Sequence, residues 1–212
     1  MQPFFTDTGV FIALEGGEGG GKSTQAELLV RWLKSLGHTV LLTREPGGTE
    51  IGSILRSIVL GHETGDLSPR TEALLYAADK AEHVDQVVLP ALEAGKIVIT
   101  DRYVDSALAY QGAGRALEVD EVEQVARWAT RSLRPHLTVV LDIDPAMGLA
   151  RFDGADRIEA EPLEFHQRVR QGFIDLAVRD PEHYLVVPAG GSADAVHADI
   201  RPAVEPWLGQ AR

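Results

Sequence analysis

Five short runs of β-branched and aliphatic residues are spaced along the chain, with longer segments of helical periodicity between them. Runs of this length and composition predict buried strands, and they cover residues 10–14, 39–43, 97–100, 138–141 and 184–187. Strands separated by helices need crossover connections, which produce a mostly parallel sheet covered on both faces. We therefore predict an α/β fold with three layers, α/β/α, around a five-stranded sheet.

Capping residues mark where individual helices begin. Residues 23–36 carry apolar side chains at helical spacing. The pair Ser68-Pro69 predicts the start of a long helix, with serine as the cap and proline in the first turn, and we expect Pro90 to interrupt it. Asp120 with Glu123 resembles a capping box at the head of another helix.

Length and composition indicate one globular domain. The chain has 212 residues, of which 44% are hydrophobic and 25% charged, and no repeat or linker is visible. Residues 1–212 are therefore expected to form a single domain, with residues 1–8 as a loose lead-in. The absence of cysteine excludes disulfides, thiolate metal sites and cysteine nucleophiles.

The net charge and the hydropathy of the chain limit the kinds of partner that it can bind. The net charge of −12 argues against a broad nucleic-acid surface and against an anionic membrane. No apolar run approaches the roughly 20 residues of a membrane span, and residues 1–3 form no basic leader, so we expect a cytoplasmic protein. Any bound anion must be held locally, by a few cations and backbone N–H groups.

A phosphate-binding loop follows the first predicted strand. Its sequence matches G-x-x-x-x-G-K-[ST] between a strand and a helix, the context that this motif requires. Glycines let successive N–H groups turn toward a phosphate, the lysine reaches the β- and γ-phosphates, and the serine hydroxyl ligates Mg²⁺. The predicted ATP-binding residues are Gly16, Gly17, Glu18, Gly19, Gly20, Gly21, Lys22, Ser23 and Thr24.

Two arginine-bearing segments follow the next strands. The second strand is followed by TREPGGT (residues 43–49) and the third by DRYVDS (residues 101–106). Ligands of parallel sheets collect beyond the carboxyl ends of the strands, so both arginines should face the phosphate loop. This arrangement predicts a second anion held in line with the first.

Several functions remain compatible with a phosphate loop. A guanine-specific switch reads its base with N-K-x-D, which a chain without asparagine cannot form. A kinase for another nucleoside monophosphate or a deoxynucleoside is the nearest alternative, and a hydroxyl acceptor would call for Asp101 or Glu18 as a base. An ATPase switch is a further alternative, but it leaves the two arginine segments unexplained.

Five segments together resemble the bacterial thymidylate kinase family from about residue 10 to residue 200. They are residues 16–24, 43–49, 72–84 (EALLYAADKAEHV), 101–112 (DRYVDSALAYQG) and 156–159 (DRIE). The resemblance implies a P-loop kinase that transfers the γ-phosphate of ATP to dTMP with Mg²⁺, giving ADP and dTDP for dTTP synthesis. It also implies a homodimer.

Specific residues acquire expected roles from this reading. Arg102 is the candidate clamp for the acceptor phosphate, because a guanidinium binds phosphate in a bidentate manner. Asp101 is expected to hold Mg²⁺, directly or through water, or to orient Arg102. Arg44 is either a second anion clamp or a structural partner of Glu45.

The resemblance also implies base and sugar contacts. Tyr76 matches the aromatic residue that stacks on thymine, and Lys80 stands where the family often has an arginine bound to thymine O4. Tyr110 matches the residue that disfavours a 2′-hydroxyl, and Glu18 an acidic loop residue near the sugar of the acceptor. Weaker candidates for base contacts are Ser106 and Gln111.

A short lid is expected at about residues 148–160. Members of the family without an arginine in the phosphate loop usually carry catalytic arginines in such a lid. Arg151 is the candidate to approach the transferring phosphoryl group, whereas Arg157, within DRIE, is expected to tie the lid to its helix.

Overall fold

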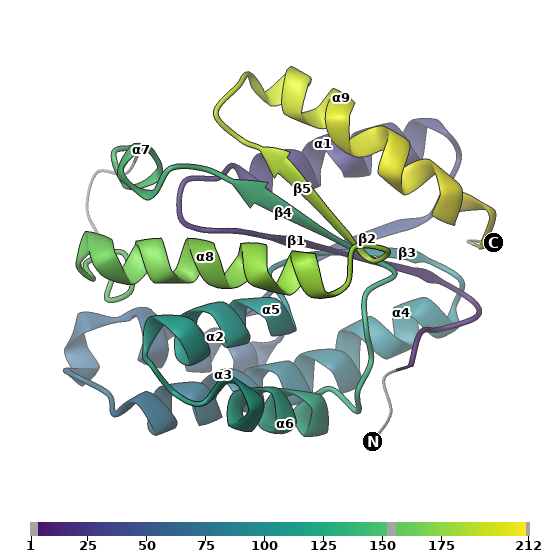
Figure 1. The fold of residues 1–212 in the computed structure, drawn as a ribbon. Coiled ribbons are helices and arrows are strands. Elements are labelled where there is room, and N and C mark those ends of the chain that lie inside the picture. Colours follow the sequence, from purple (N-terminus) through teal and green to yellow (C-terminus); the bar gives the residue numbers. More distant parts are fainter. Residues whose placement is uncertain (1–3, 152–155, 211–212) are drawn as a thin grey trace.

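The computed structural model describes residues 4–151 and 156–210, which are built around one five-stranded sheet (Figure 1). All strand pairs are parallel, in the order β2-β3-β1-β4-β5. The strands are β1 (Val10–Glu15), β2 (Val40–Arg44), β3 (Ile97–Asp101), β4 (Leu137–Asp142) and β5 (Tyr184–Pro188). All five predicted strands are thus confirmed, with ends shifted by one residue or none.

Helices cover both faces of this sheet. They are α1 (Lys22–Ser35), α2 (Glu50–Leu60), α3 (Pro69–His83), α4 (Leu89–Glu93), α5 (Val104–Ala107), α6 (Val119–Ala129), α7 (Pro145–Leu149), α8 (Leu163–Arg179) and α9 (Ala193–Val204). Figure 1 shows α1 and α9 above the sheet, and α3, α4, α6 and α8 below it. The expected three-layer α/β/α arrangement is confirmed.

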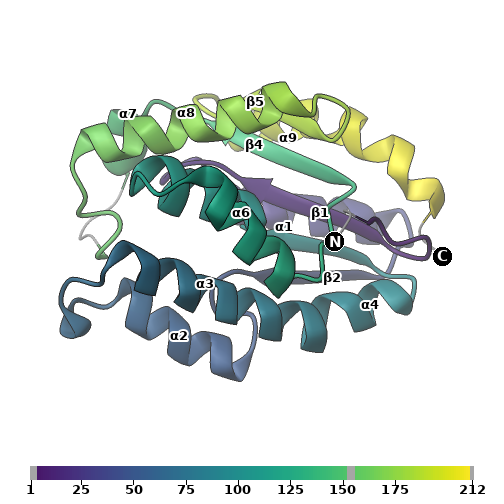
Figure 2. The same cartoon turned by 60° about the horizontal axis from the view of Figure 1, so that its bottom comes forward.

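The alternation of side chains along β1 explains why helices pack against both faces of the sheet. Successive side chains of a strand point to opposite faces. Ile12 and its alternate neighbours pack with Leu29 of α1 and Ile200 of α9, whereas Phe11 packs with Val88 and Leu92 on the other face. Every residue of β1 is buried, as expected for the central strand of a parallel sheet. Figure 2 shows α6 beside α3 on the second face.

The long helix after Ser68 begins as predicted and ends differently. The Ser68 side chain accepts a hydrogen bond from the Thr71 N–H at 3.3 Å. The α-helical geometry stops at His83 and continues through a π-helical turn (Val84–Val88) into α4, so the change precedes Pro90. Proline lacks an N–H and its ring crowds the carbonyl four residues earlier, which explains a wider turn just before it.

The capping box predicted at Asp120 and Glu123 is wrong. Helix α6 begins at Val119 after Glu118, which makes no side-chain cap. Asp120 lies inside the first turn, where its negative charge still interacts favourably with the positive end of the helix dipole. Glu123 turns toward Arg127, whose Nε donates to it at 2.9 Å.

The described part of the lead-in is packed rather than loose. Phe4 forms an isolated bridge with Leu133, and the Phe5 ring stacks on His183 with centroids 4.7 Å apart. Residues 1–3 lie outside the described residues, as do residues 152–155 in the expected lid. Within the described ranges, no helix is long and apolar enough to cross a membrane.

Candidate active site

The phosphate loop runs from the end of β1 to the start of α1. Gly16, Gly19 and Gly21 have φ of 129°, 70° and 85°, which favours glycine at these positions. Lys22 is buried, and its ammonium donates to the carbonyls of Gly16 at 3.1 Å and Gly17 at 2.7 Å. Burial, and then the charge of Arg102, lower the pKa of Lys22. The lysine is therefore held inside the loop that it was predicted to serve.

Sheet register places the two expected metal ligands together. Asp101 pairs with Leu14 of β1, one residue before the loop-proximal end of that strand. The Ser23 hydroxyl donates to the Asp101 carboxylate at 2.6 Å. A hydroxyl and a carboxylate beside a phosphate loop match the oxygen ligands that Mg²⁺ prefers, so these residues fit the ion.

Arg102 lies at the centre of a polar network. Its backbone has φ of 72°, which is uncommon outside glycine. Its guanidinium donates to Glu18 at 2.6 Å, and to the Gly16 carbonyl and the Ser106 hydroxyl at 3.2 Å each. It also lies 4.9 Å above the Tyr110 ring. These contacts fix the guanidinium beside the phosphate loop.

Glu18 is held in its ionised form. Burial opposes ionisation, but Arg102 and Lys22 outweigh it and lower the pKa of Glu18 to about 2. The Tyr110 hydroxyl also donates to this carboxylate, at 2.8 Å. A carboxylate with so low a pKa is a poor general base at neutral pH.

Two contiguous cavities meet at this network. The larger, of about 470 Å³, is lined by the phosphate loop together with Arg44, Asp101 and Arg151. The smaller, of about 120 Å³, is lined by all the residues expected to contact the base and sugar: Glu18, Tyr76, Lys80, Ser106, Tyr110 and Gln111. Residues common to both linings are Glu18, Glu45, Arg56, Arg102 and Glu159. The two cavities therefore adjoin each other beside the phosphate loop.

Comparisons with known proteins agree with this geometry. A sequence profile described as thymidylate kinase matches residues 14–200. The chain is 54% identical to thymidylate kinase of Clavibacter sepedonicus, with 92% of this chain and 93% of the relative aligned. It is also 54% identical to that of Cutibacterium acnes, with coverages of 92% and 96%.

A solved structure shares the fold. Thymidylate kinase from Ehrlichia chaffeensis superimposes with a TM-score of 0.79 at 30% identity, covering 92% of this chain and 98% of that one. The chain belongs to the thymidylate kinase family. It is accordingly an enzyme, a nucleotide-biosynthetic kinase of the transferase class with ATP as its phosphoryl donor.

Lys80, one of the expected base contacts, is tied into the protein. Its ammonium donates to Glu45 at 2.5 Å and to the Tyr103 carbonyl at 2.9 Å. His83 bonds the other Glu45 oxygen at 2.7 Å. The alternative that paired Arg44 with Glu45 is thus wrong, because both Glu45 oxygens are taken by residues of α3. Within the described ranges no ion pair involves Arg44.

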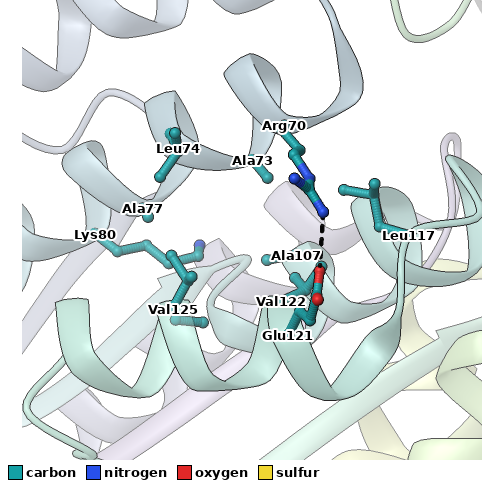
Figure 3. A pocket seen from close by; sticks show the side chains of 11 residues that line it. Arg70, Ala73, Leu74, Ala77, Lys80, Ala107, Leu117, Glu121, Val122 and Val125 are labelled. Carbon is teal, nitrogen blue, oxygen red and sulfur yellow. Dashed lines mark hydrogen bonds and ion pairs between the residues drawn. The ribbon is translucent and has the colours of Figure 1, made fainter.

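The stem of Lys80 also lines an apolar groove between α3 and α6. Figure 3 shows Leu74 and Ala77 on one side of this groove and Val125 on the other, with the Arg70–Glu121 ion pair across it at 3.5 Å. Lys80 is therefore held with its alkyl chain toward the groove and its ammonium toward Glu45. This groove includes no residue of the phosphate loop.

The two arginines of the segment expected to form a lid differ in their contacts. Arg151, just after α7, donates to the Gly19 carbonyl at 2.5 Å. Arg157 donates to the Val59 carbonyl at 2.9 Å and pairs with Glu72, which also binds Gln111. Arg151 therefore contacts the phosphate loop, whereas Arg157 joins the DRIE segment to α2 and α3.

Sequence reasoning missed Arg56 and the buried charge cluster behind it, which consists of Glu45, Asp79, Lys80 and His83. Arg56 lines both cavities, and its guanidinium donates to the Pro46 carbonyl at 3.0 Å. It is carried by α2, whose apolar spacing over residues 50–60 was the available signal. The Glu45 pairs join residues more than 30 positions apart, so no local pattern marks them.

Replacing Asp79 tests the charge cluster. Burial, and then Glu45, raise the pKa of Asp79 to about 6. One of its oxygens accepts the Gly47 N–H at 3.0 Å, and the other has no partner in the described part of the chain. Because the folded form binds a proton more tightly than the unfolded form, this group makes stability fall as pH rises from about 4 to 6.

We expect Asp79→Asn to raise the free energy of unfolding at pH 8 by on the order of 2 kcal/mol. It should change that free energy little at about pH 2.5, which lies below both pKa values, so that the carboxyl is protonated in both states. Urea titrations at the two pH values measure the difference. An equal effect at both would contradict the assigned ionisation.

Replacing Gly148 tests the contact between α7 and the phosphate loop. A Cβ at Gly148 would overlap the Glu18 carbonyl oxygen, and one at Gly19 would overlap the Gly148 carbonyl. We expect Gly148→Ala to displace the loop and lower kcat/KM for ATP about tenfold, or about 1.4 kcal/mol. Gly209→Ala, where a Cβ meets nothing within 4 Å, is the control. Equal kinetics for the two variants would refute the contact.

Proposed function

We propose that this protein transfers the γ-phosphoryl group of ATP to dTMP, yielding ADP and dTDP. The observation that carries the proposal is the junction between the two cavities, where the guanidinium groups of Arg102 and Arg56 line both, beside the carboxylates of Glu18, Glu45 and Glu159. A donor in the phosphate loop and an acceptor in the smaller cavity would bring their phosphates together there. Alignment of the two reactants and neutralisation of their charge can supply several kcal/mol of catalysis.

The carboxylates of the site indicate whether the acceptor is a phosphate or a hydroxyl group. A phosphate monoester is mostly dianionic at pH 7, so its oxygen is already a nucleophile and needs no base. Glu18 has a pKa of about 2, and Asp101 accepts the Ser23 hydroxyl. A phosphate acceptor therefore suits this site better than the hydroxyl of a deoxynucleoside, which would need a free base.

Three cations would act on the reacting phosphates in this proposal. Lys22 binds the β- and γ-phosphates, Arg102 clamps the acceptor phosphate, and Arg151 approaches the phosphoryl group from the lid. Arg44, which lines the larger cavity without an ion-pair partner among the described residues, acts as a second anion clamp. Ser23 and Asp101 would hold Mg²⁺, directly or through water, and the bound ion would neutralise phosphate charge.

The nucleoside of the acceptor would be held by the smaller cavity. Tyr76 is half-buried there and offers a ring for stacking on the base. Tyr110 is fixed by its bond to Glu18 and would disfavour a 2′-hydroxyl. Base contacts are assigned to Lys80, Ser106 and Gln111, each of which also bonds within the protein.

The setting of the enzyme is part of the proposal. We assign a single domain acting as a cytoplasmic homodimer on small nucleotides, without a nucleic-acid or membrane partner. The net charge of −12 supports the exclusion of nucleic acids and anionic membranes. Light scattering of the purified protein would measure the number of copies.

A panel of acceptors tests the proposed reaction. With ATP and Mg²⁺, ADP formation is expected to depend on dTMP and to exceed the rate with thymidine, dCMP or water at least a hundredfold. Product chromatography should identify dTDP. Turnover that ignores dTMP, or faster turnover with thymidine, would refute the proposal.

Removal of the acceptor clamp tests Arg102 itself. Arg102→Ala should lower kcat/KM for dTMP by about 10²–10³-fold, as loss of a preorganised donor to a developing charge does. The KM for ATP should stay within about twofold. Arg31→Ala, an exposed arginine on α1, is the control and should keep both constants. Unchanged dTMP kinetics in Arg102→Ala would remove its assigned role.

A further inference from the structure

Glu15, the last residue of β1, is a fully buried carboxylate that lines neither of the two cavities. Both of its oxygens face the start of α5. One accepts the backbone N–H groups of Tyr103 at 2.8 Å and Ser106 at 3.1 Å, and the other accepts the Ser106 hydroxyl at 2.6 Å. Three donors converge on this one side chain.

Helix α5 lacks a cap of its own. Its N-cap residue, Tyr103, makes no side-chain capping bond. The first N–H groups of a helix have no partner within it and need an acceptor elsewhere. Glu15 supplies that acceptor from a neighbouring strand, and its charge also suits the positive end of the helix dipole.

The same contacts set the direction of the Ser106 hydroxyl. A carboxylate can only accept, so this hydroxyl donates to Glu15 and its own lone pairs remain free to accept. Arg102 donates to this oxygen at 3.2 Å. A chain of hydrogen bonds thus runs from Glu15 through Ser106 to the guanidinium.

We propose that Glu15 is a positioning residue, which orients Arg102 through the Ser106 hydroxyl and the first turn of α5. The inference rests on the proposed function, because it takes Arg102 to be the acceptor clamp. Glu15 itself has no exposed surface, so it acts through Arg102 rather than on a nucleotide.

Removing the charge of Glu15 without changing its shape distinguishes this positioning role from a merely structural one. Burial, and then Asp105, raise the pKa of Glu15 to about 7. Other groups that face it are Arg102, Lys22 of α1 and Tyr184 of β5. A neutral side chain of the same shape should therefore fold at least as well at pH 8, while it changes the direction of hydrogen bonding at Ser106.

Glu15→Gln provides the test. Its amide N–H₂ would either donate to Ser106, in competition with Arg102, or face the two backbone N–H groups. At pH 8 we expect an unchanged or higher Tm, a KM for dTMP raised about tenfold, a lower kcat, and a KM for ATP within twofold. Normal dTMP kinetics would overturn the proposal.

A double-mutant cycle with Arg102→Ala makes the test specific. Residues that act through one another have non-additive effects. Adding Glu15→Gln to Arg102→Ala should change kcat/KM for dTMP by less than threefold. Multiplicative losses would overturn the positioning role. If Arg102→Ala alone has no effect, the assigned clamp fails instead, so the two failures are distinguishable.

Two further variants complete the design. Tyr184→Phe removes the hydroxyl that donates at 2.8 Å to Asp105, the buried carboxylate on α5 itself. It should lower Tm but leave the KM for dTMP unchanged. If the KM for dTMP rises as much as in Glu15→Gln, any loosening of α5 weakens dTMP binding, and the proposal is overturned. If Glu15→Gln fails to fold, Glu15→Asp keeps the charge but draws the carboxylate back from Tyr103 and Ser106. That variant should raise the KM for dTMP and add less than threefold in the Arg102→Ala background; larger losses there overturn the proposal.

Discussion

Repulsion between two phosphate-bearing molecules is the constraint on which this site depends. The chain carries a net charge of −12, so the positive charge needed to bring two polyanions together has to be concentrated. It is concentrated at the carboxyl ends of β1, β2 and β3, where Lys22, Arg102, Arg56 and Arg151 surround adjoining cavities. Electrostatic stabilisation of this kind is most effective when the groups are already in place.

Buried carboxylates keep those cations and helices in place. Glu18 pairs with Arg102, Glu45 with Lys80, and Glu72 with Arg115 and Arg157. Although burial opposes ionisation, the partners lower the pKa of all three carboxyls. Each pair joins segments distant in sequence, so the walls of both cavities are cross-linked by charge.

Local patterns predicted the strands and the phosphate loop because both depend on residues adjacent in sequence. Contacts between residues distant in sequence could not be predicted in this way. Lys80 was identified by its place in a motif. Its hydrogen bond to Glu45, however, depends on how α3 lies relative to the end of β2. Arg56 was missed because α2 was not assigned. The false cap at Asp120 shows that a local capping pattern does not fix where a helix begins: the helix starts two residues earlier, after Glu118, which makes no side-chain cap.

Simultaneous binding of both nucleotides is the most direct test of this account. Calorimetric titration with dTMP, without and with a saturating non-hydrolysable ATP analogue and Mg²⁺, measures whether one opening holds both. The account predicts one dTMP per chain in each case, with the Kd changed by less than about tenfold. Loss of dTMP binding in the presence of the analogue would mean that the two compete for a single site, and would contradict it.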